Sequence, residues 1–63
     1  MPIIQFDGPN MTKEDKAQLA AKLTQAATEV FPAIPAEAYV LVIRENSREN
    51  FAVGGKLVAD KAK

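Results

Sequence analysis

The sequence predicts an α/β (α+β) fold: a β-α-β subunit with parallel strands, a C-terminal hairpin or short strand, and assembly into an oligomer. Two short β-rich runs flank one long amphipathic helix pattern. Strands joined by such a helical crossover run parallel. The chain has 63 residues, enough for one domain over residues 1–63 and too few to bury a large core alone.

The first strand is expected over residues 2–6, before the turn-forming residues 7–10. Thr12 is then placed to cap a helix. Pro32 and Pro35 end this helix, because proline cannot continue the hydrogen-bonding pattern. The apolar stripe of the helix recurs at helical spacing and consists of Leu19, Leu23, Ala26, Ala27 and Val30.

The second strand is expected over residues 38–43, an unbroken apolar run typical of a strand buried on both faces. Residues 46–55 are polar and then glycine-rich, which indicates a loop with room for a tight hairpin, and residues 56–63 form a short strand or a frayed tail. One helix can cover only one face of a two-stranded sheet. The other face would expose apolar side chains, and such a patch normally marks an interface.

The composition excludes several function classes. The chain has no cysteine and no histidine, which excludes thiol nucleophiles, serine–histidine pairs and histidine-bound metals, so no metal or cofactor is expected. Eight basic and eight acidic residues give zero net charge, which argues against nucleic acid as a partner. No apolar run is long enough for a membrane span, and the first residues lack the features of a signal peptide. We therefore expect a cytoplasmic protein without a membrane partner.

Pro2 is the residue best suited by type and position to carry out chemistry: it follows the initiating methionine. Methionine before a small residue such as proline is generally excised, which exposes a secondary amine. Burial lowers the pKa of an amine because the charged form loses hydration, and a neutral amine can act as a general base. While Met1 is attached, the Pro2 nitrogen is an amide without a basic lone pair. The alternative interpretation is that Pro2 only begins an edge strand.

Three segments together resemble the 4-oxalocrotonate tautomerase family: Met-Pro-Ile-Ile-Gln at 1–5, Thr-Lys-Glu-Asp-Lys at 12–16 and Glu-Asn-Phe-Ala-Val-Gly-Gly-Lys-Leu at 49–57. The resemblance covers essentially the whole chain. It implies β-α-β subunits assembled as homohexamers (trimers of dimers), with the amine of Pro2 as catalytic base. The implied isomerase activity interconverts enol and keto, or unsaturated keto acid, forms of a small carboxylate.

The same resemblance places Phe51 at the family's aromatic wall of the substrate site. Two arginines that bind a diacid in the family align with Met11 and Val40 here, and neither residue is basic. Arg44 lies four residues after Val40 and therefore on the same strand face. Arg44 and Arg48 are the candidates for binding a substrate carboxylate. Each is alternatively a solvated surface arginine.

Two other functions stay open at this point. A related chemistry adds water to an unsaturated acid, and it needs a carboxylate beside the proline, for which Glu45 is the nearest candidate. The other alternative is a non-catalytic oligomer that binds a small molecule or serves as a scaffold. The missing family arginines favour that alternative, and retention of Met1 would favour it further.

Overall fold

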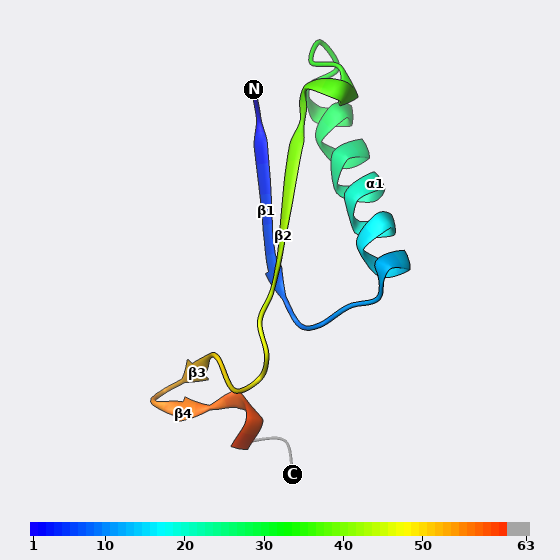
Figure 1. Ribbon diagram of the computed structural model, residues 1–63. Coiled ribbons are helices and arrows are strands. Elements are labelled where there is room, and N and C mark those ends of the chain that lie inside the picture. The colour runs from blue at the N-terminus through cyan, green and yellow to red at the C-terminus, as the bar shows by residue number, and fades with distance from the viewer. Residues whose placement is uncertain (61–63) are drawn as a thin grey trace.

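The chain forms a two-stranded parallel sheet with one helix beside it. A computed structural model describes residues 1–60 (Figure 1). Strands β1 (Ile3–Gly8) and β2 (Val40–Glu45) pair in register, with Ile3 opposite Val40 and Gly8 opposite Glu45. Helix α1 (Lys13–Val30) connects them and runs alongside the sheet (Figure 1). The predicted β-α-β unit with parallel strands is confirmed.

Helix α1 begins at the predicted cap. The Thr12 hydroxyl accepts a hydrogen bond from the backbone N–H of Asp15 at 3.1 Å, which satisfies one of the free donors of the first turn. At the other end the Phe31 N–H donates to the Ala27 carbonyl at 3.0 Å, and Pro32 follows. The sequence therefore specifies both ends of the helix by side-chain and proline chemistry.

The sheet covers only part of the apolar stripe of α1. Three of the five predicted stripe residues are half-buried: Leu19, Leu23 and Ala27. Ala26 and Val30 are exposed, against expectation. A two-stranded sheet can contact only part of a stripe that winds over about five helical turns.

The strand boundaries differ from those expected. β1 continues to Gly8 because Asp7 and Gly8 pair with Arg44 and Glu45. β2 begins at Val40 because residues Ala36–Ala38 form a 3-10 turn, η1, instead of strand. The Tyr39 hydroxyl donates to the Ala27 carbonyl at 3.3 Å, so this turn is tied to the end of α1.

One face of the sheet lacks a cover. Because side chains alternate along a strand, Ile4 and Phe6 point to the α1 side while Ile3 points to the other face. Ile3 is 59% exposed. No side chain among residues 1–60 is fully buried, so the expectation that β2 is buried on both faces is wrong for the single chain. We call the surface formed by Ile3, Gln5, Asp7, Val40, Val42 and Arg44 the open sheet face.

A small hairpin follows the sheet. β3 (Ala52–Val53) and β4 (Lys56–Leu57) pair antiparallel. The turn residues Gly54 and Gly55 have φ of 63° and 82°, the left-handed pair that a type I′ turn requires. The hairpin is confirmed, and residues Val58–Asp60 form a second 3-10 turn, η2. The rest of the predicted tail, residues 61–63, lies outside the described residues.

The chain is extended for its size. Its radius of gyration is 15.0 Å and its extents are 46 × 24 × 15 Å, whereas a compact chain of this length has a radius of about 11 Å. The hairpin projects away from the β-α-β unit beyond the carboxyl ends of the strands (Figure 1). No helix in residues 1–60 combines the length and the apolarity needed to cross a bilayer.

Candidate functional site

Pro2 is held at the amino end of β1. Its carbonyl accepts a hydrogen bond from the Val40 N–H at 3.0 Å, which fastens the residue to the first position of β2. The side chain is half-buried, and the ring restricts rotation about its own backbone. With Met1 attached, residue Pro2 is therefore confined in space and partly covered.

A cleft lies at the opposite end of the sheet, between the carboxyl end of β1 and the hairpin. It has a volume of about 610 Å³ and is lined by residues 7–9, Asn46, Arg48, Phe51 and Val58. Ligand sites for small molecules generally measure about 300–1,000 Å³. The cleft thus has the size of a small-molecule site and contains two of the predicted site residues, Arg48 and Phe51.

Backbone hydrogen bonds fix the segment that carries these two residues. The Ala59 N–H donates to the Arg48 carbonyl at 3.0 Å, and the Val58 N–H donates to the Phe51 carbonyl at 3.1 Å. Phe51 remains 44% exposed, so its ring presents apolar surface. η2 thereby holds one cation and one aromatic ring at the cleft.

Arg44 lies elsewhere, on the open sheet face. Its guanidinium is 3.8 Å from the Asp7 carboxylate, and the side chains of Arg44 and Asp7 are 57% and 54% exposed. Such an exposed pair contributes little, because water and salt screen it. Asp7 also lines the cleft that holds Arg48. Asp7 was not predictable as a cleft residue because it stands among turn-forming residues, where acids are common.

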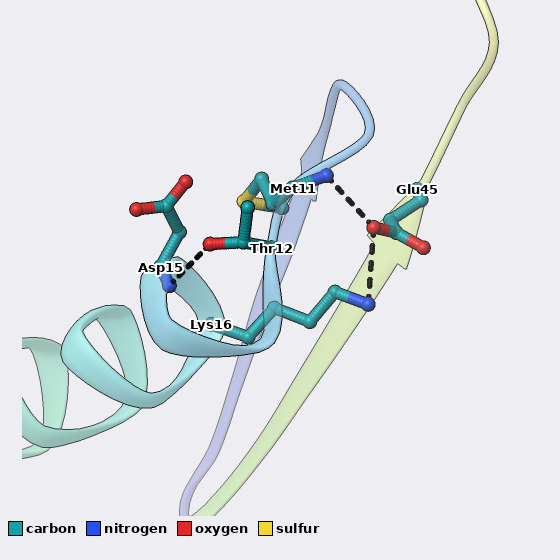
Figure 2. A network of polar contacts seen from close by, with 5 residues as sticks. All are labelled: Met11, Thr12, Asp15, Lys16 and Glu45. Carbon is teal, nitrogen blue, oxygen red and sulfur yellow. Dashed lines mark hydrogen bonds and ion pairs between the residues drawn. The ribbon is translucent and has the colours of Figure 1, made fainter.

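Glu45 is engaged by the segment that enters α1 (Figure 2). Its carboxylate accepts hydrogen bonds from the Met11 N–H at 2.9 Å and from the Lys16 ammonium at 3.0 Å. The Met11 hydrogen bond first, and then that from Lys16, lowers the pKa of Glu45 below its usual value. A carboxylate bound in this way is poorly suited to activate water, so the hydration alternative loses its candidate. No sequence signal links Glu45 to Met11, 34 positions apart.

The single chain does not bring all the predicted site residues together. Pro2 precedes β1 and the cleft begins at its far end, so the two are separated by roughly 20 Å at about 3.3 Å per residue. In Figure 1 the N-terminus lies at one end of the sheet and the hairpin lies beyond the other end. A site that combines Pro2 with Arg48 and Phe51 requires a second chain.

Known proteins that resemble this chain in sequence and in structure belong to one family. The sequence matches the model of the tautomerase enzyme family over residues 2–61. A curated protein of Bacillus cereus described as a probable tautomerase is 46% identical over 50 residues, which are 79% of this chain and 80% of that protein. TomN, a 4-oxalocrotonate tautomerase homologue in the tomaymycin biosynthetic pathway, has a TM-score of 0.88 and 31% identity, covering 95% of this chain and 92% of its own. DmpI from Archaeoglobus fulgidus has a TM-score of 0.84 and 34% identity, covering 94% and 100%.

The family match spans nearly the whole chain, and the fold neighbours share the parallel β-α-β unit and hairpin. The resemblance seen in residues 1–5, 12–16 and 49–57 is confirmed. This chain therefore belongs to the tautomerase family, with 4-oxalocrotonate tautomerase homologues as structural neighbours.

Proposed function

We propose that this chain is a tautomerase that interconverts the enol and keto forms of a small carboxylate, with the Pro2 amine as general base once Met1 has been removed. The observation that carries the proposal is the position of Pro2, half-buried and fastened to Val40 at the head of β1. Family membership supplies the reaction class. A constrained and partly shielded secondary amine is suited to accept a proton near neutral pH.

The proposed reaction moves one proton within the substrate. The Pro2 nitrogen removes the proton of the enol hydroxyl, which leaves an enolate. The resulting ammonium returns a proton to the substrate carbon, the carbonyl forms, and the amine is regenerated. Arg48 binds the substrate carboxylate, and Arg44 is the second candidate for this role. Phe51 covers the substrate and limits access of water, which strengthens the electrostatic contacts inside the site.

The proposed active unit is an assembly. Pro2 and the cleft lie at opposite ends of β1, so two copies with antiparallel β1 strands would place Pro2 of one copy beside the cleft of the other. Such a two-fold arrangement yields two equivalent sites per pair. The open sheet face, with exposed Ile3 and Val40, supplies apolar surface for association between pairs. We therefore propose a homohexamer built as a trimer of dimers; a 4-oxalocrotonate tautomerase from Chloroflexus aurantiacus, 30% identical, is a heterohexamer.

The test uses protein confirmed by intact mass to begin at Pro2. We expect ketonisation of phenylenolpyruvate or 2-hydroxymuconate, followed by ultraviolet absorbance, to exceed the buffer rate. Pro2→Ala should lower the rate at least about 100-fold, as expected for loss of a positioned base. The matched control is the same chain with Met1 retained, which should be equally inactive because its Pro2 nitrogen is an amide.

Two outcomes would contradict the proposal. Equal rates for the Pro2 and Met1 forms would remove the amine from the mechanism. Rates at the buffer level for both substrates, with a free Pro2 amine confirmed, would instead favour a non-catalytic binding or scaffold role.

A further inference from the structure

The cleft contains one basic and one acidic residue, and this pairing affects monocarboxylates and dicarboxylates differently. Arg48 supplies one cation and Asp7 supplies one carboxylate, while Pro9, Phe51 and Val58 contribute apolar surface. Within residues 1–60 Arg48 forms no ion pair. Its guanidinium therefore remains available to form a bidentate contact with one carboxylate.

A second carboxylate on the same ligand would meet different surroundings. Besides Arg48, the one charged residue that lines this cleft is Asp7, whose carboxylate also faces Arg44. Arg44 neutralises Asp7 only in part, because the two groups are 3.8 Å apart and both are more than half exposed. Like charges brought close together disfavour binding and provide discrimination between ligands. The apolar residues would also remove water from a second carboxylate without offering it a side-chain donor. Of the uncharged lining side chains, only the Asn46 amide could donate a hydrogen bond to it.

We propose that the Arg48–Asp7 pair makes this cleft selective for monocarboxylates with an apolar body and that Asp7 is the residue that excludes dicarboxylates. The proposal rests on the function proposed above, because it assigns the substrate class of the same site. An aryl-substituted enol acid suits the cleft: its carboxylate binds Arg48, and its ring packs against Phe51. Asp7 acts on the substrate through its charge and takes no part in the proton transfer.

The first experiment compares kcat/KM for phenylenolpyruvate and 2-hydroxymuconate. The wild-type chain should favour the monocarboxylate at least about five-fold, in keeping with a like charge that Arg44 compensates only in part. Asp7→Asn should raise the ratio of kcat/KM for 2-hydroxymuconate to that for phenylenolpyruvate about 3- to 10-fold. Arg48→Ala should raise KM for both substrates, because both use the same arginine.

Two further variants separate the charge of Asp7 from indirect effects. The gain should persist in Asp7→Asn/Arg44→Ala, which shows that it does not come from releasing Arg44. Glu29→Gln removes one negative charge from the last turn of α1, away from the cleft-lining residues, and should leave the substrate ratio unchanged. A ratio that Asp7→Asn does not move, or a wild-type preference for the diacid, would overturn the proposal.

Binding of unreactive ligands tests selectivity apart from catalysis. Calorimetry with cinnamate and with muconate should show tighter binding of cinnamate. In Asp7→Asn the dissociation constants of the two acids should lie closer together. If neither enol is ketonised but this binding preference holds, the catalytic proposal fails and the selectivity of the cleft stands. Equal binding of the two acids, or tighter binding of muconate, would overturn the selectivity whatever the catalytic result.

Discussion

The Glu45 carboxylate accepts two hydrogen bonds from the segment that leads into α1, and both donors favour its charged form. The contact joins the carboxyl end of β2 to Met11, directly before the cap residue Thr12 (Figure 2). It therefore ties the start of α1 to the end of β2. Glu45 acts as a structural link here, although sequence alone made it a candidate for activating water.

The lowered pKa of Glu45 predicts how stability depends on pH. Because the pKa is lower in the folded chain than the ordinary value of 4.5, the stabilisation is complete above that value and is lost as the pH falls through the folded pKa. Thermal unfolding at fixed protein concentration should show Glu45→Gln less stable than wild type at pH 6. The difference should shrink toward pH 3.

The control for this measurement is Glu29→Gln, because the Glu29 carboxylate has no hydrogen bond or ion pair within residues 1–60. Glu29→Gln should not be less stable than wild type at pH 6, because it removes an acid from the last turn of the helix, where a negative charge is unfavourable. A difference between wild type and Glu45→Gln that does not vary between pH 6 and pH 3 would show that the hydrogen bonds to Glu45 do not stabilise the fold.

At the scale of elements, the sequence predicted the helix ends and the hairpin turn, which are determined by nearby residues. The cap at Thr12, the proline stop after α1 and the Gly54-Gly55 turn each depend on residues close in sequence, and each was predictable. The extension of β1 to Gly8 was not, because it depends on pairing with Glu45 across the sheet. Proximity of Asp7 to Arg48 is likewise a product of tertiary structure. The sequence marked both candidate arginines but could not assign them to different surfaces.

The hairpin turn provides a test at this scale. Gly54 has φ of 63°, and a Cβ added there would meet nothing within 4 Å, so a substitution acts through the backbone alone. Gly54→Val should destabilise the chain by about 1–2 kcal/mol, the cost of a left-handed conformation. Gly54→Asn should stay near wild type, because asparagine tolerates this region and favours type I′ turns. Denaturant unfolding of the two variants measures the difference, and equal destabilisation would mean that φ at this turn does not limit stability.

At the scale of the whole molecule, the single chain is an incomplete unit. Its radius of gyration of 15.0 Å and its lack of any fully buried side chain within residues 1–60 both indicate that a partner supplies the missing contacts. The same architecture separates Pro2 from the cleft that holds Arg48 and Phe51. In the proposed assembly, stability and the completion of the site depend on the same association, and loss of assembly should remove both.

Mixing two impaired variants, assayed with substrate well below KM, tests this dependence directly. Pro2→Ala retains the cleft, while Arg48→Ala retains the Pro2 amine. If each site takes Pro2 from one copy and the cleft from another, random assembly of equal amounts should make about a quarter of the sites intact, because each half is present in half of the subunits. Unfolding the two variants together and refolding them should therefore restore activity toward about a quarter of wild type, with assembly checked by sedimentation. Separately refolded variants mixed afterwards serve as the control and should show only the mean of their separate low rates until subunits exchange. No recovery in assembled mixtures would mean that each chain completes its own site, and the proposed antiparallel pairing would then be wrong.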